Sequence, residues 1–367
     1  MRVGVIGGGQ LGRMLALAGL PLGMDFHFID PSPEAPAREL GHLIVAPFDD
    51  RAAMFDFAQA VDVVTYEFEN VSAPLLREVQ VARPVMPSTD ALETSQDRLS
   101  EKRLFQSLGI PTTRYVALDH EAELSRAIEQ TGLPAILKTR RLGYDGRGQV
   151  PIYEPGDAGA AFQTLANAPG GLILEGRVVF EREISMVACR DQTGAVVFYP
   201  PGENVHQGGI LRSSYAPFRE SPLVRQAESH VGRILEHFDY IGVLAVEFFV
   251  EDGILIANEM APRVHNSGHW TIEASVTSQF ENHLRALAGL PLGRTDMRQE
   301  ALLVNAVGRM PDASAVLACP DVHLHDYRKA PRPGRKVGHV TALADSRESL
   351  EELAPRLFEM VPFERHG

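Results

Sequence analysis

Cysteines are scarce in this sequence, and long apolar runs are missing from it. Only Cys189 and Cys319 are present, too few for a disulfide scaffold and without the spacing of metal ligands, which indicates buried free thiols. No apolar run reaches the roughly 18 residues that a membrane-spanning helix needs, and the first residues enter a strand-like segment instead of a signal peptide. We therefore expect a cytoplasmic protein without membrane association.

Basic side chains are also fewer than acidic ones. The chain has 35 Lys and Arg against 48 Asp and Glu, for a formal net charge of −13, which argues against non-specific nucleic-acid binding. Any bound phosphate must therefore meet a local basic cluster. The 44% hydrophobic and 23% charged content excludes a disordered or fibrous chain, and 367 residues predict two or three domains.

Short apolar runs alternate with helical stretches over residues 1–95. This βαβ rhythm predicts a Rossmann-like domain, with a mostly parallel sheet and a ligand crevice beyond the carboxyl ends of its strands. The predicted strands are residues 3–6, 26–29, 43–45 and 61–65, and the predicted helices are residues 11–20 and 51–59.

The pattern then changes to longer strands, so we expect a mixed α/β and α+β protein of three domains. Residues 96–294 form the central domain, and residues 112–182 within it form a flap of paired strands around a glycine-rich loop. Strands at 243–250 and 254–259 resemble a hairpin. Residues 295–367 form a small C-terminal domain with a strand at 302–307 and a final helix near 346–360.

A glycine turn follows the first predicted strand. Residues 7–12, Gly-Gly-Gly-Gln-Leu-Gly, satisfy G-x-G-x-x-G, and Asp30 comes 18 residues after the last glycine. Glycines let a phosphate approach the backbone, and the helix start supplies N–H donors. The pattern leaves three interpretations open: NAD binding, another ligand at this crevice, or a purely structural turn.

Glu67 and Glu69 follow the last strand of the first domain. Strand alternation predicts that they lie on the same side, where two carboxylates repel unless a cation or amine lies between them. They either grip a substrate amine or ribose hydroxyl, or form a solvated strand end.

The region most informative about chemistry joins Lys138 to a loop at residues 143–149. A lysine at the end of an apolar strand, followed by three glycines and an arginine, can surround a polyphosphate with N–H groups and cations. No Walker motif occurs there, so the nucleotide-binding architecture must be a different one. Glu175 and Glu183 come later, where strand-end carboxylates could hold an adenine amino group and ribose hydroxyls, or simply be surface acids.

Glu247 and Glu259 lie in or at the end of otherwise apolar strands, where an unpaired charge is costly. Together with Asn258 they suit Mg²⁺ that also binds substrate phosphates, the alternative being an ion pair with an arginine. Arg263 could then hold a small planar oxyanion through two parallel hydrogen bonds. His265 and His269 are four residues apart, but a zinc site would require a helix there.

A basic stretch at residues 328–339 lies in the C-terminal domain. It forms either a pocket for one phosphomonoester or a nucleic-acid-binding tail, and the acidic background favours the pocket.

In this order, the motifs resemble the ATP-grasp superfamily and, within it, the N5-carboxyaminoimidazole ribonucleotide synthetase family of purine biosynthesis. The resemblance covers nearly the whole chain, and residues 258–270 are its specific part. It implies a ligase that joins bicarbonate to 5-aminoimidazole ribonucleotide through carboxyphosphate, with ATP converted to ADP and phosphate. It also implies Mg²⁺, or Mn²⁺ in its place, and a homodimer.

The resemblance also implies roles for individual residues. The ATP contacts are Arg98, Lys138, Gly143, Tyr144, Asp145, Gly146, Arg147, Gly148, Gln149, Glu175, Gly176, Arg177, Val178, Glu183, His206, Asn258 and Glu259. The metal ligands are Glu247 and Glu259. The ribonucleotide contacts are Gln10, Leu11, Glu67, His265, Asn266, Ser267, Arg332, Arg335 and Lys336, and the catalytic residues are Lys138, Asp145, Arg263 and Lys336.

Three rival functions stay open from the sequence. One is an ATP-grasp ligase that uses formate or a different carboxylate. The second is an NAD-dependent oxidoreductase built on the glycine turn and Asp30. The third is a nucleotide sensor that binds ATP without turnover.

Overall fold

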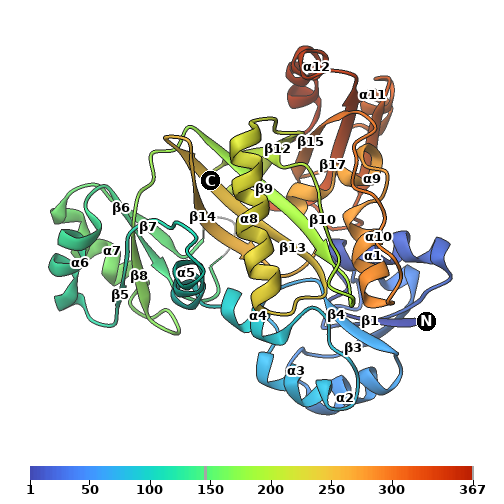
Figure 1. Cartoon of the computed structure of the whole chain (residues 1–367), viewed down its shortest axis with the longest axis horizontal. Helices are drawn as coiled ribbons and strands as arrows, with labels where there is room; N and C mark the ends of the chain where they lie inside the picture. Colours follow the sequence, from blue (N-terminus) through green and yellow to red (C-terminus); the bar gives the residue numbers. More distant parts are fainter. Residues whose placement is uncertain (144–146, 366–367) are drawn as a thin grey trace.

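A computed structural model describes residues 1–143 and 147–365 of the chain, which form three sheets with flanking helices (Figure 1). The first sheet is parallel, with strand order β3-β2-β1-β4, as predicted for residues 1–95. Its elements are β1 (Arg2–Ile6), α1 (Gln10–Gly19), β2 (Asp25–Asp30), β3 (His42–Val45), α2 (Arg51–Gln59), β4 (Val63–Tyr66), α3 (Ala73–Gln80) and α4 (Thr89–Ser95).

The prediction that strand alternation places Glu67 and Glu69 on the same side is wrong. β4 stops at Tyr66, so Glu67 and Glu69 lie in an irregular bend and do not share a strand face. Strand alternation therefore does not determine their directions.

The predicted flap is a four-stranded antiparallel sheet with order β5-β8-β6-β7. Apolar side chains of both helices and the strands form its own core, separate from the others. It therefore projects as a lobe beside the central sheet (Figure 1). Its elements are β5 (Tyr115–Leu118), α6 (Leu124–Thr131), β6 (Ala135–Thr139), β7 (Gln149–Ile152), α7 (Ala158–Leu165) and β8 (Leu172–Gly176).

The central sheet has nine strands, in the order β14-β13-β9-β11-β12-β15-β17-β16 with β10 beside β9. Its strands are β9 (Arg182–Arg190), β10 (Val196–Phe198), β11 (Gly202–Gln207), β12 (Ile210–Ala216), β13 (Gly242–Glu251), β14 (Ile254–Ala261), β15 (Glu300–Gly308), β16 (Val322–Asp326) and β17 (Arg332–Ala344). The last three extend the sheet of the central domain, so residues from 295 onward add to that sheet and do not form a separate one. The division of the chain near residues 95 and 294 stays our proposal.

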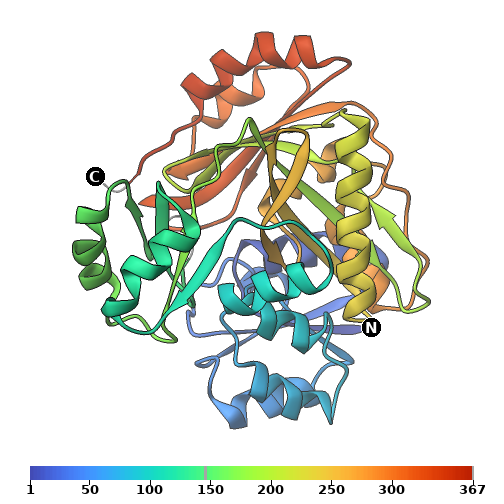
Figure 2. The ribbon, with the colours of Figure 1, turned by 60° about the vertical axis from the view of Figure 1, so that its left-hand side comes forward.

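Helices cover both faces of the central sheet. On one face, α8 (Ser221–His237) and α5 (Arg98–Ser107) pack apolar side chains against β9, β13 and β14. On the other, α10 (Gln279–Leu287) lies between the sheet and α1, so one core joins the N-terminal domain to the central one. The remaining helices are α9 (Thr271–Ala274), α11 (Ala313–Leu317) and α12 (Arg347–Met360), and α12 lies across the sheet from the N-terminal domain (Figure 2).

The thiols agree with the sequence expectation. Cys189 and Cys319 are both buried and free. In the described part of the chain, no helix is both long and apolar enough to span a membrane.

Candidate active site

Two carboxylates face each other on the edge strand β14 of the central sheet and on its neighbour β13. Glu247 of β13 pairs with Glu259 of β14 in antiparallel register, so both side chains leave the same face. Burial raises the pKa of Glu247 to about 7; His206 opposes this shift and Glu259 adds to it. Repulsion across these two strands would therefore be relieved by a cation.

The donor chemistry of this pair fits a hard divalent ion. Carboxylate oxygens are preferred Mg²⁺ ligands, and Mg²⁺ completes its shell with water and phosphate oxygens. Among residues 1–143 and 147–365, no group of three or more His, Cys, Asp or Glu could hold a metal. The pair therefore suits an ion that arrives with a polyphosphate. Arg98 Nη1 also lies 3.4 Å from Glu259 Oε2, so the alternative of an arginine ion pair is partly realised.

His206 lies beside this pair and is bonded to Glu183. Its Nδ1 contacts Glu183 Oε2, joining β11 to β9. Burial opposes the charged imidazole, but the hydrogen bond to Glu183 and the charges of Glu247 and Glu183 outweigh it, so the pKa of His206 is raised. The structure thus brings Glu183, His206, Glu247 and Glu259 together from four strands.

Lys138 and Glu175 form a buried ion pair between β6 and β8. Lys138 Nζ lies 2.8 Å from Glu175 Oε2, and Lys102 Nζ lies 3.9 Å from the same oxygen. Burial disfavours the carboxylate, but both lysines outweigh it and lower the pKa of Glu175 to about 2. Glu175 is therefore no surface acid. Its Oε1 is buried without a described partner, which leaves one acceptor for a ligand.

Sequence reasoning gave Lys102 no role. It lies on α5, and its Nζ donates to the carbonyls of Asn258 at 2.8 Å and Ala257 at 3.2 Å. Its neighbour Glu101 accepts the N–H of Met260 at 2.7 Å. Together they hold β14 at the residues expected to meet ATP and metal. The sequence signal for this role was the pair Glu101 and Lys102, one helical turn after Arg98.

The glycine-rich loop starts and ends close to this ion pair. Thr139 N donates to the carbonyl of Gly148 at 2.8 Å, and Gln149 pairs with Lys138 at the start of β7. Gly143 at the other end lies 3.5 Å from an Arg98 donor. The predicted contacts Tyr144, Asp145 and Gly146 lie outside the described residues, so their roles stay predictions, as does that of Arg147.

The backbone at the end of β8 makes hydrogen bonds within the protein. Gly176 N donates to the Arg114 carbonyl at 2.8 Å, and Arg177 N donates to the Pro134 carbonyl at 2.9 Å. Both N–H groups are thus occupied within the protein. A base could therefore not accept from these two N–H groups, whereas Glu175 Oε1 has no described partner.

Glu67 fills the glycine turn with its own carboxylate. Oε1 accepts from Gly9 N, Oε2 accepts from Gly12 N at 2.7 Å, and Asp30 Oδ2 accepts from Gly8 N at 2.9 Å. Burial raises the pKa of Glu67 although these N–H groups and Lys329 oppose it. A pyrophosphate would find these donors occupied, which favours a structural turn over NAD binding. Of the predicted contacts here, Gln10 starts α1 and the Leu11 side chain is buried in the core.

Arg263 and Glu69 connect the central and N-terminal domains. Arg263 Nη2 lies 2.5 Å from Glu69 Oε1, and Nη1 donates to the Val264 carbonyl at 3.0 Å. The Nε of Arg263 is buried and has no partner among the described residues. Glu67 and Glu69 therefore point to different partners, and Arg263 keeps one donor for an anion.

The residues after Arg263 form a single helical turn at the metal pair. His265 Nε2 lies 3.8 Å from Glu247 Oε1, and its Nδ1 bonds Ser267 Oγ at 2.9 Å. Asn266 exchanges two amide hydrogen bonds with Asn305, at 2.8 and 3.1 Å. Sequence reasoning missed Asn305, although an asparagine inside an apolar strand was a signal, because a buried amide needs partners. His269 is buried against the ring of His339. Among the described residues, neither His269 nor His265 belongs to a group of three or more side chains that could hold a metal ion.

The basic stretch approaches from the C-terminal strand β17. The charge of Lys336 contributes to lowering the pKa of His265, after burial and Arg263, and also acts on Glu247. Arg335 donates to the Ala330 carbonyl at 3.3 Å, and burial followed by the charge of Arg332 lowers its pKa. The charge of Lys336 therefore reaches the site around Glu247 and His265.

Comparisons with known proteins agree with this arrangement. Three family models match in succession: a ribonucleotide synthetase preATP-grasp domain over residues 1–96, an ATP-grasp domain over 103–280, and a phosphoribosylaminoimidazole carboxylase C-terminal domain over 301–353. N5-carboxyaminoimidazole ribonucleotide synthase of Pseudomonas aeruginosa is 50% identical, covering 96% of this chain and 97% of its own length. The enzyme of the same name from Brucella melitensis is 45% identical, covering 93% and 96%.

Solved structures give the same result. The N5-carboxyaminoimidazole ribonucleotide synthetase of Thermus thermophilus has a TM-score of 0.94 and 50% identity, over 100% of both chains. The synthase of Aspergillus clavatus, in complex with ADP and 5-aminoimidazole ribonucleotide, has a TM-score of 0.91 and 32% identity, over 98% of both. The chain therefore belongs to the N5-carboxyaminoimidazole ribonucleotide synthase family of ATP-grasp ligases.

Proposed function

We propose that this chain uses ATP and bicarbonate to convert 5-aminoimidazole ribonucleotide to N5-carboxyaminoimidazole ribonucleotide, ADP and phosphate. The observation that carries the proposal is the Glu247 and Glu259 pair, which faces Arg98, His206 and His265 in one site. Family membership supplies the substrates, and this pair supplies the place where a metal-bound triphosphate would lie.

The first step joins bicarbonate to the γ-phosphate of ATP. A bicarbonate oxygen attacks phosphorus, the bond to the β-phosphate oxygen breaks, and ADP leaves, so carboxyphosphate forms. Arg263 would orient bicarbonate through its free Nε, and Lys138 would offset negative charge on the transferring group. A divalent ion held by Glu247 and Glu259 would supply further charge neutralisation at the phosphates.

The second step transfers carbon to the exocyclic amine of the ribonucleotide. The amine attacks the carboxyl carbon of carboxyphosphate, or CO₂ released from it, then loses a proton, and phosphate leaves. Carboxyphosphate hydrolyses readily, so we propose that the flap formed by β5 to β8 closes to exclude water. Asp145 is proposed to orient the amine.

The 5′-phosphate of the ribonucleotide is assigned to Arg332, Arg335 and Lys336. The electrostatic reach of Lys336 to His265, and of Lys329 to Glu67, supports a site that joins the C-terminal strand to the N-terminal crevice. Glu67 and Asn266 are occupied by internal hydrogen bonds, so their contact with substrate would require an exchange of partners.

Three further assignments belong to the same proposal. The ion is Mg²⁺, or Mn²⁺ in its place, and the enzyme acts in the cytoplasm without binding nucleic acid. We also propose a homodimer, because Leu17, Leu20 and Leu22 leave three large apolar side chains 38–48% exposed at the end of α1. Light scattering coupled to gel filtration would give the mass of two chains, and a mass of one chain would refute the dimer.

The function is tested by ADP release with ATP, bicarbonate and ribonucleotide omitted in turn. Release should require all three, and formate should not replace bicarbonate. Formate-dependent release would favour the rival ligase. ATP binding without release would favour a sensor, and reduction of NAD at 340 nm by candidate alcohols would favour an oxidoreductase.

A further inference from the structure

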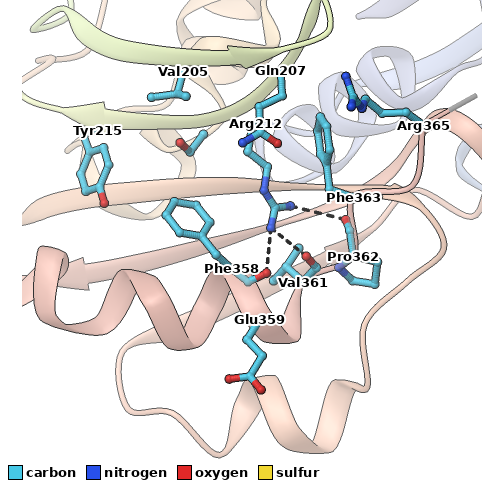
Figure 3. A pocket seen from close by; sticks show the side chains of 11 residues that line it. Val205, Gln207, Arg212, Tyr215, Phe358, Glu359, Val361, Pro362, Phe363 and Arg365 are labelled. Carbon is cyan, nitrogen blue, oxygen red and sulfur yellow. Dashed lines mark hydrogen bonds between the residues drawn. The ribbon is translucent and has the colours of Figure 1, made fainter. Parts of the chain in front are cut away.

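Arg212 on β12 is a buried cation, 5% exposed, with no carboxylate partner in the part of the chain that the structure describes. Its four terminal N–H groups instead meet four backbone carbonyls, so its hydrogen-bonding capacity there is filled. The acceptors are Asn305 at 3.0 Å and Pro362 at 3.4 Å from Nη1, and Phe358 at 3.0 Å and Val361 at 2.9 Å from Nη2. Figure 3 shows the bonds to Pro362, Phe358 and Val361. The rings of Phe358 and Phe363 lie 5.3 and 5.1 Å from its Cζ.

This guanidinium links the hairpin of β11 and β12 to the end of α12. A cavity of about 660 Å³ lies between the two. It is lined on the hairpin side by Val205, Gln207, Arg212, Ser213 and Tyr215, and on the other by Phe358, Glu359, Val361, Pro362, Phe363 and Arg365. Three of the four carbonyls around Arg212, which we call its carbonyl cage, belong to this C-terminal segment, so the guanidinium joins the hairpin to it.

Arg212 is also the extra residue of a β-bulge. The hairpin turns through Gly208 and Gly209, both with positive φ (60° and 79°), which suits a two-residue loop. After this turn His206 pairs with Leu211, but Val205 pairs with Ser213. Arg212 is thus left opposite no residue.

The bulge determines where His206 points. The ladder from β11 to β9 ends at Asn204, and the ladder from β12 to β15 ends at Ser213. Beyond these ladders, residues 205–212 are held by the hairpin's own bonds, by the carbonyls around Arg212, by the Asn305 bond to the Leu211 carbonyl and by the bond between His206 and Glu183. A slip of one residue would send the His206 side chain to the opposite face, away from Glu183.

We propose that Arg212 is a positioning residue that locks this bulge and so aims His206 at Glu183 and Glu247. Asn305 reinforces the lock, because its carbonyl accepts from Arg212 while its Nδ2 donates to the Leu211 carbonyl at 2.9 Å. The effect on ATP rests on the proposed function, whereas the effect on His206 does not.

The test compares Arg212→Met, Arg212→Lys and Arg347→Met. Methionine keeps the length of the side chain without donors, and lysine keeps the charge with three donors for four carbonyls. Arg347 is the matched control, since it covers the ring of Tyr215 on the same strand, at 3.8 Å, outside the bulge. The readouts are the pH titration of the His206 imidazole by ¹H–¹⁵N NMR and ADP affinity by calorimetry.

Arg212→Met should move the His206 titration midpoint down toward the ordinary value of about 6.5. It should also weaken ADP binding about tenfold, which corresponds to the loss of one hydrogen bond. The His206 midpoint and the ADP affinity of Arg212→Lys should lie between those of Arg212→Met and the wild type. Both quantities should be unchanged in Arg347→Met. A wild-type His206 midpoint in Arg212→Met overturns the inference. A moved midpoint with unchanged ADP affinity supports the lock and contradicts only the ATP role of His206. If Arg212→Met does not fold, an Arg212→Lys midpoint equal to that of the wild type overturns the inference.

Discussion

Glu247 shows at the scale of one residue why this site needs a cation. The side chain is 14% exposed, and burial raises its pKa to about 7, so it resists ionisation in the folded chain. A carboxyl group whose pKa is raised on folding is destabilising once pH passes its unfolded value, and this cost is complete above the folded value. Without a bound ion, the wild type should therefore lose stability between pH 4.5 and 7.

Glu247→Gln should remove that loss. At pH 8 without Mg²⁺ we expect the variant to melt higher than the wild type, by on the order of 3 °C, and to melt equally below pH 4.5. Added Mg²⁺ should raise the melting temperature of the wild type only. Glu251→Gln, with the same charge change on the same strand, is the control. Parallel pH profiles for wild type and Glu247→Gln would contradict the account.

Glu175 is the opposite case, a carboxylate kept ionised by two lysines. Glu175→Gln should leave Lys138 and Lys102 as buried cations without a counterion, at a cost of about 3–5 kcal/mol in urea unfolding at pH 7. Because the pKa of Glu175 is lowered to about 2, its stabilisation is complete above pH 4.5 and lost as pH falls toward 2. The double variant Glu175→Gln/Lys138→Met should recover part of the loss. Additive losses would contradict the pairing.

The elements show what a sequence pattern can and cannot predict. The parallel first sheet, the flap and the β13–β14 hairpin follow from period and turn residues, and the structure confirms them. The common side of Glu67 and Glu69 was mispredicted because the hydrogen bonds from the glycine turn to Glu67 join distant parts of the chain. The ion pair of Lys138 and Glu175, 37 residues apart, was hidden for the same reason.

The turn between β1 and α1 depends on that carboxylate. Glu67→Ala should leave the N–H groups of Gly9 and Gly12 unpaired and cost about 1–3 kcal/mol in urea unfolding. Glu67→Gln should cost less, since its amide oxygen still accepts one of them. Glu39→Ala, an exposed acid in the same domain, should change the unfolding free energy little. An unaltered midpoint for Glu67→Ala would refute the capping role.

At the scale of the whole molecule, the sheet brings together residues from three sequence regions. Glu247 and Glu259 come from the central strands, Lys336 from the C-terminal strand, and Glu69 reaches Arg263 from the N-terminal domain. The order of motifs predicted the family correctly. The contacts between motifs could not be predicted, because strand order in the sheet does not follow chain order.

Lys336 tests the assembly of the ribonucleotide site. Lys336→Ala should raise the KM for 5-aminoimidazole ribonucleotide about tenfold to hundredfold, the loss of one charged hydrogen bond, with the KM for ATP little changed. Arg356→Ala on the exposed side of α12 should change neither. An unaltered ribonucleotide KM would remove Lys336 from the phosphate site.

The central claim is that bicarbonate attacks the γ-phosphate in the site around Glu247 and Glu259. The most direct measurement uses ¹⁸O-labelled bicarbonate with ATP and 5-aminoimidazole ribonucleotide, followed by mass spectrometry of the inorganic phosphate. The account predicts one labelled oxygen in each phosphate released, because the attacking oxygen stays on phosphorus. Phosphate without label, formed at the full rate of ADP release, would contradict it.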